Sequence, residues 1–147
     1  MNLYLLARIA GSLAFTLMLA QIILATWFRH LIKWHMRIGK AAFILAWLHP
    51  VLLGFAWNLG GYVWLGRIGL VMLTAAVIAA VLRIKHWRWI HRLNYVVFVM
   101  IYIHSWNLGT DARSFPLTLI YWLSPVIIIA ALTTKLLNSR IASNGNK

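Results

Sequence analysis

The sequence predicts an all-α protein, a polytopic membrane bundle of about five transmembrane helices. Hydrophobic residues make up 63% of the chain and charged residues only 10%, whereas a soluble domain carries about 25% charged residues. The mean hydropathy is +0.84, and the apolar residues gather in runs long enough to cross a bilayer core about 30 Å thick. The predicted spans are residues 3–28, 36–57, 62–82, 91–108 and 116–136.

Each span is bounded by polar or turn-forming residues. The first is too long for a secretory signal peptide and is not followed by a small-residue cleavage site, so it is interpreted as a membrane helix. Basic residues separate the first span from the second, and the turn sequence NLGGY separates the second from the third. The stretches RIKHWRWIHR and GTDARSFP precede the fourth and fifth spans. Because these connections are short, we expect one membrane domain over residues 1–147 and no dehydrogenase domain.

The charge is distributed asymmetrically. The chain has 14 Lys and Arg residues against a single acidic residue, Asp111. With five spans, Arg8, Arg67 and Arg113 lie on one side of the membrane and all other cations lie on the opposite side. The positive-inside rule then predicts an N-terminus outside and a C-terminus in the cytoplasm. Topology and anionic lipid headgroups account for the cations, so we expect membrane lipid rather than nucleic acid as a partner.

The same composition excludes several kinds of functional site. Without cysteine, the chain cannot form a disulfide or hold a thiolate-bound haem or an iron–sulfur cluster. With a single carboxylate, it lacks the paired acids that general acid–base catalysis often uses. Histidine, arginine and the aromatic residues are left as candidate functional groups.

Four of the six histidines belong to the second and fourth spans: His35 and His91 lie at their cytoplasmic ends, and His49 and His104 lie deeper, toward the outer surface. His35 and His49 are fourteen residues apart, so they share a helix face and lie about 21 Å apart along the helix axis. His91 and His104 have a similar separation on the fourth span. Polar groups at membrane depth are costly and normally functional. Two imidazoles at each of two depths therefore predict the axial ligands of two haems, b-type because the chain has no CxxCH motif.

By spacing alone, either of two histidines could bind the same iron as His35. Thirteen residues leave His91 and His104 about 140° apart around an ideal helix, so a shared face requires local overwinding or a helix that starts near His91. His86, eighteen residues before His104, would share its face but matches the depth of His35 less well. His91 and His86 are therefore alternatives on this argument.

Two stretches, HMRIGKAAFILAWLH and WRWIHRLNYVVFVMIYIH, carry a resemblance to a known family. They are similar to the ferric reductase-like transmembrane domain, which includes iron reductases, NADPH oxidases and the haem-binding subunit of the periplasmic methionine-sulfoxide reductase system. The resemblance covers roughly residues 10–135. It implies two bis-histidine haems, with His35 and His91 as iron ligands on the cytoplasmic side and His49 and His104 on the outer side.

The resemblance also implies a function. Its string W-x-x-[IL]-H-R-L-x-Y, matched here from Trp87 to Tyr95, favours His91 over His86 as the ligand. The chain would pass electrons from a cytoplasmic flavin reductase-type or NAD(P)H-linked donor to an acceptor protein or small oxidant outside. Without a GxGxxG phosphate loop, it is most similar to the methionine-sulfoxide reductase haem subunit. That branch implies an electron-transfer subunit of an oxidoreductase system in the bacterial inner membrane, with FMN at the cytoplasmic face as a further cofactor.

Four arginines are predicted to contribute to cofactor binding, because haem propionates bind cationic side chains. Arg37 and Arg92 adjoin the ligands of the cytoplasmic side. Arg67 and Arg113 are, with Arg8, the cations of the outer side.

Two other functions stay open at this point. One is a terminal ferric or oxygen reductase membrane subunit, which would deliver electrons at the outer haem. The other is a haem-free structural membrane subunit, whose histidines only mark the membrane interfaces.

Overall fold

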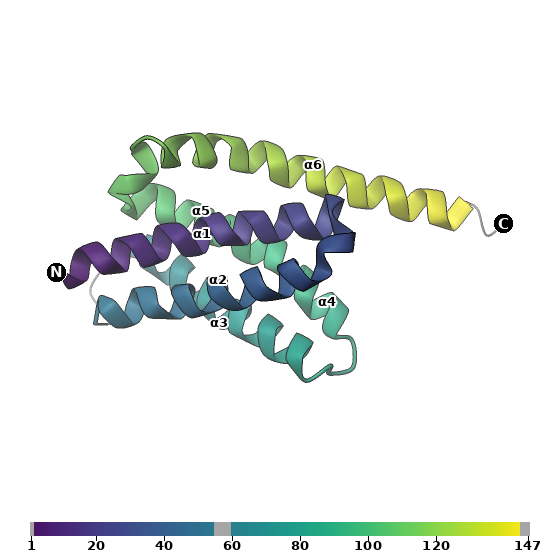
Figure 1. Cartoon of the computed structure of the whole chain (residues 1–147), viewed down its shortest axis with the longest axis horizontal. Coiled ribbons are helices and arrows are strands. Elements are labelled where there is room, and N and C mark those ends of the chain that lie inside the picture. Colours follow the sequence, from purple (N-terminus) through teal and green to yellow (C-terminus); the bar gives the residue numbers. More distant parts are fainter. Residues whose placement is uncertain (1, 55–59, 145–147) are drawn as a thin grey trace.

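Helices make up nearly all of the chain that the structure describes (Figure 1). The structure is a computed structural model that describes residues 2–54 and 60–144. No strand occurs among these residues, so the prediction of an all-α protein is confirmed. The elements are α1 (Leu3–Trp27), η1 (Arg29–Leu31), α2 (Ile32–Leu52), α3 (Gly61–Val81), α4 (Trp87–Arg92), α5 (Asn94–Leu108), η2 (Thr110–Arg113) and α6 (Leu117–Asn144).

Three helices in the described part of the chain are long and apolar enough to cross a membrane. They are α1, α3 and the segment Leu117–Ile141 of α6. These three are compatible with an integral membrane protein. The other two predicted spans also form helices, but α2 carries Lys33, Arg37 and Lys40 among its 21 residues, and α5 has only 15 residues. The prediction of a five-span membrane bundle is therefore supported only in part.

Three predicted boundaries differ from the structure. α2 begins at Ile32, four residues before the expected start, and ends at Leu52, while positions 55–57 of that span lie outside the described residues. α4 begins at Trp87, inside a stretch that was expected to be a loop. α6 continues to Asn144 instead of ending at 136, because its polar last turns contain no glycine or proline that would stop a helix.

A local tightening divides the fourth predicted span into α4 and α5. The Leu93 N–H donates to the Ile90 carbonyl, three residues back, at 3.0 Å, which is the pattern of a 3₁₀ turn. A 3₁₀ turn rotates the chain further per residue than an α-helix does. It therefore changes the rotational phase between His91 and His104 in the direction that their thirteen-residue spacing requires, by about 20° for each residue of the turn.

Two antiparallel helix pairs and one further helix form the bundle. α1 packs along α2, and α3 packs along α4 and α5. α6 lies against α1, and its last turns extend beyond the ends of the other helices (Figure 1). α1 begins and α6 ends at opposite ends of the bundle (Figure 1).

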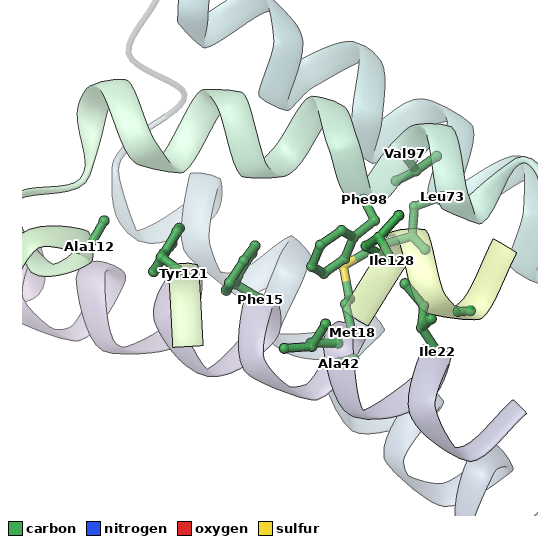
Figure 2. Packing of buried hydrophobic residues seen from close by; sticks show 12 residues of the cluster. Phe15, Met18, Ile22, Ala42, Leu73, Val97, Phe98, Ala112, Tyr121 and Ile128 are labelled. Atoms are coloured by element: carbon green, nitrogen blue, oxygen red, sulfur yellow. The ribbon is translucent and has the colours of Figure 1, made fainter. Parts of the chain in front are cut away.

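Stacked aromatic rings hold the middle of the bundle together. The Phe15 ring of α1 stacks on Phe98 of α5, with centroids 5.0 Å apart, and on Tyr121 of α6 at 4.3 Å (Figure 2). Phe15 and Phe98 are each only 1% exposed. Because three helices share this one ring, Phe15 fixes how α5 and α6 pack on α1.

The only acidic side chain of the sequence joins α1 to the α5–α6 connection. The Arg8 Nε donates a hydrogen bond to Asp111 Oδ2 at 2.9 Å, and the Arg8 Nη2 donates to Asp111 Oδ1. Both side chains are partly exposed. The Arg8 guanidinium lowers the pKa of the Asp111 carboxyl from its usual value.

Phe15→Ala should destabilise the protein by about 3–5 kcal/mol, because it removes the ring that three helices share and leaves a cavity. Thermal unfolding in detergent, followed by circular dichroism, measures the loss. Phe28→Ala is the matched control, since Phe28 is 44% exposed, and it should change the melting temperature little. Equal losses in the two variants would contradict the central role of Phe15.

Acidification should weaken the link between α1 and η2. Because the pKa of Asp111 is lowered in the folded state, the ion pair stabilises the fold at neutral pH, and this contribution is lost as the pH falls through that lowered pKa. Between about pH 7 and about pH 3, the melting temperature should fall more for the wild type than for Asp111→Asn. A wild type no more sensitive to pH than the variant would show that the pair contributes nothing.

Candidate functional site

Two pairs of facing imidazoles stand at two levels of the bundle. The His35 ring of α2 faces His91 of α4, with ring centroids 6.1 Å apart and planes at 78°. The His49 ring of α2 faces His104 of α5, with centroids 6.4 Å apart and planes at 83°. Their positions on α2 separate the two levels by about 21 Å along the helix. The structure thus brings together the four histidines that the sequence singled out, in the same two pairs, and leaves exposed His86 outside them.

The spacing within each pair fits a metal ion between the rings. Two imidazoles bound to one metal ion in trans, each through a metal–nitrogen bond of about 2.0 Å, have ring centres about 6.3 Å apart. In addition, no Cα atom described in α2 lies within 8 Å of one in α4 or α5. The imidazoles therefore meet in the space between helices whose backbones stand apart, where a planar group can lie between them.

Each level offers two nitrogen ligands and no more. Within the described residues, no three His, Cys, Asp or Glu side chains converge where they could hold a metal ion. A structural zinc ion takes four protein ligands. Two imidazoles instead complete the coordination of an iron that already has the four nitrogens of a porphyrin.

Backbone carbonyls orient both rings of the His49–His104 pair. The Nδ1 of His49 lies 2.8 Å from the Ala7 carbonyl oxygen, and the Nδ1 of His104 lies 2.8 Å from the Tyr62 carbonyl oxygen. Since a carbonyl only accepts hydrogen bonds, Nδ1 carries the proton in each ring. The Nε2 lone pair is then free to bind a metal ion, in the arrangement typical of metal-ligating histidines.

Two glycines let these rings lie directly on neighbouring helices. A Cβ added to Gly11 of α1 would lie 2.8 Å from His49 Nδ1, and one added to Gly66 of α3 would lie 2.7 Å from His104 Nδ1. Each glycine follows the hydrogen-bonding carbonyl by one helical turn. Sequence analysis missed both residues, although Gly11 precedes His49 by as many residues as Gly66 precedes His104. A comparison of the two halves of the chain would have found this signal.

The His35–His91 pair is supported differently. The Asn94 Nδ2 lies 3.3 Å from His91 Nδ1, while the buried Asn94 Oδ1 has no hydrogen-bond partner. Rotating the amide by 180° places the oxygen against His91 Nδ1, which can then donate its proton to it. On α2, Gln21 Nε2 donates to the His35 carbonyl at 2.8 Å. This bond positions the His35 backbone, while His35 Nδ1 itself is buried without a partner.

The four arginines predicted to bind cofactor lie on the surface or near it. Arg37 and Arg92 are exposed, and their guanidinium carbons lie 5.4 Å and 4.6 Å from the ring centroids of Trp34 and Trp89. The Arg67 guanidinium lies 4.9 Å from the Trp64 ring centroid. Exposed Arg113 ends η2. These cation–π contacts are typical of a membrane interface, so a role of the four arginines toward a cofactor stays a prediction.

Comparison with protein-family models, with curated proteins and with solved structures gives no match for this chain. The inference of function therefore depends on the site itself, on the two imidazole pairs and the groups that orient them.

Gly11→Ala and Gly66→Ala should each destabilise the protein by about 1–3 kcal/mol, because the added methyl group overlaps a histidine ring that a hydrogen bond to a backbone carbonyl holds in place. Thermal unfolding in detergent measures this loss. Gly61→Ala is the control, since a Cβ there meets nothing within 4 Å. If all three variants unfold at the wild-type temperature, the two glycines do not hold the rings.

Proposed function

We propose that this protein is a transmembrane b-type cytochrome that passes electrons through two bis-histidine haems, similar to the haem-binding subunit of the methionine-sulfoxide reductase system. In this proposal α2 and the α4–α5 segment cross the bacterial inner membrane together with the three apolar helices. The N-terminus is outside and the C-terminus is in the cytoplasm. The start of α1 and the end of α6 lie at opposite ends of the bundle (Figure 1), as an odd number of crossings requires.

One observation carries the proposal: two imidazole pairs at two levels, each with the centroid spacing of trans ligands to a single iron. The glycines under His49 and His104 and the carbonyls that fix their tautomers also fit such ligands. Bound haem would supply one-electron redox chemistry at its iron. With two imidazoles as its protein ligands, such a haem would pass electrons on without binding oxygen or ferric iron at its iron, so either a relay or a terminal reductase of this kind would work by outer-sphere transfer.

The surface beside the His35–His91 pair suits an anionic electron donor. His86, Trp87, Arg88, Trp89 and Arg92 line a shallow depression there, and the Trp87 ring centroid is 6.1 Å from that of His91. Cations beside flat aromatic rings favour a phosphate-bearing planar molecule such as FMN, or an acidic flavin reductase that carries one.

The number of electrons that the donor releases sets the number that the acceptor must take up. A reduced flavin or NAD(P)H gives up two electrons, so each donor molecule would support two one-electron transfers between haems held at the His35–His91 level and at the His49–His104 level. The acceptor, a protein or a small oxidant on the outer side, must take up both electrons. The chain would contribute the iron ligands and their orientation to this process.

Purified wild-type protein should contain two b haems per chain, measured as the pyridine haemochrome. His49→Ala and His91→Ala should each lose one haem, because a bis-histidine site cannot hold iron in the same way through one imidazole. His86→Ala is the matched control and should keep both haems, since His86 is exposed and outside both pairs.

The haem content of the wild type decides between this proposal and its alternatives. A wild type without haem, made in cells with ample haem supply, would leave a structural membrane subunit as the remaining interpretation. One haem per chain would limit electron transfer to a single level and contradict the crossing proposed here.

A further inference from the structure

The end of the bundle that holds the His35–His91 pair contains polar groups without partners. Four buried side-chain atoms in the described part of the chain make no hydrogen bond: Thr26 Oγ1, His35 Nδ1, Asn94 Oδ1 and Tyr95 OH. They come from the end of α1, the start of α2 and the start of α5, which meet at this end of the molecule. Buried polar atoms are normally hydrogen-bonded, so their concentration at one place indicates a missing polar partner.

A lysine from α6 reaches the same place. The Lys135 Nζ lies 4.5 Å from the centroid of the Tyr95 ring. Tyr95 follows His91 by four residues, about one helical turn, at the start of α5. Lys135 lies within the apolar segment Leu117–Ile141 and is only partly exposed. A cation in such a segment is costly unless it faces a partner inside the protein.

The chain itself provides no anion for this lysine. Asp111 is the only acidic residue in the sequence, and it is paired with Arg8 in the opposite region of the bundle, at the start of α1. When the Asn94 amide is rotated so that its oxygen accepts from His91 Nδ1, the Asn94 Nδ2 group and the Tyr95 hydroxyl are both donors without partners at the start of α5. A partly buried ammonium group with neighbouring neutral donors and no carboxylate is suited to bind an anionic oxygen group from a ligand.

We propose that Lys135, assisted by Tyr95 and Asn94, binds a propionate carboxylate of the haem held by His35 and His91, here called the inner haem. The inference rests on the proposed function and extends it, because it makes α6 part of the inner site and assigns a role to a cation that sequence analysis missed. Lys135 is a positioning residue, and its charge also favours the reduced iron, which carries one positive charge fewer than the oxidised iron.

A redox titration tests this assignment in the His49→Ala background, where only the inner haem remains. Lys135→Met should lower the equilibrium constant for reduction of that haem about tenfold, which is about 59 mV for one electron. Lys135→Arg, which keeps the charge, should restore a midpoint potential close to that of the background protein. Tyr95→Phe should lower the potential in the same direction by less, because it removes one neutral hydrogen bond.

Lys85→Met is the matched control, because it removes an equal charge from an exposed turn at the same end of the molecule. It should leave the midpoint potential unchanged, and circular dichroism should show the same helix content in all variants. Loss of the inner haem from Lys135→Met, with recovery in Lys135→Arg, would equally support the assignment.

Other outcomes overturn it. An unchanged potential in Lys135→Met, in a protein that holds the inner haem, would mean that the lysine binds another anion such as a lipid phosphate. Equal shifts in Lys135→Met and Lys85→Met would reveal only the general field of the basic surface. In either case two haems in the wild type would leave the proposed function standing, whereas a wild type without haem would end both proposals.

Discussion

The hydrogen bonds from the Nδ1 atoms of His49 and His104 to backbone carbonyls fix how each of these histidines lies against the neighbouring helix of its own pair. Each bond joins a histidine to the neighbouring helix of its own pair, to Ala7 on α1 or to Tyr62 on α3. The rings can reach these carbonyls only because a glycine, one turn further along each helix, leaves them room. The Nε2 atoms are thereby available to a ligand between α2 and α5. Packing, tautomer and metal-binding capacity are thus consequences of one repeated arrangement.

Because the sequence has a single acidic residue, almost none of its cations can form an ion pair within the chain. The single carboxylate, Asp111, is paired with Arg8 and holds the α5–α6 connection against α1. Three exposed arginines, Arg37, Arg88 and Arg92, instead lie over tryptophan rings. Lys135 differs from them, because it is partly buried beside the His35–His91 pair and no acidic side chain is free to neutralise it. A cation in an apolar segment is costly without a partner, and a cofactor with carboxylates is suited to that role.

The helices could be located from the sequence more readily than their ends or the pairing of the histidines. Helical segments could be located because apolar runs between basic or turn-forming stretches have few alternatives to a helix in a membrane. Their ends were harder to predict, because α4 and the last turns of α6 contain many polar or basic residues. Such residues are compatible with a helix, but a hydropathy profile does not distinguish them from a loop. The thirteen-residue spacing of His91 and His104 conflicted with one ideal helix, and the structure instead places them on two helices, α4 and α5, with a tightened turn at Leu93 between them. Haem binding and electron transfer stay predictions that the imidazole geometry supports.

The sequence by itself determined the all-α class, the apolar segments and the histidines that stand out at two depths, because these depend on composition and on the period of a single helix. Only the tertiary structure decided which groups surround those histidines. Gly11, Gly66 and Lys135 belong to helices that contribute no histidine to either pair, so their importance appears only when α1, α3 and α6 are packed against the rest. Contacts between helices depend on which faces meet, and the period of one helix carries no information about the face of another.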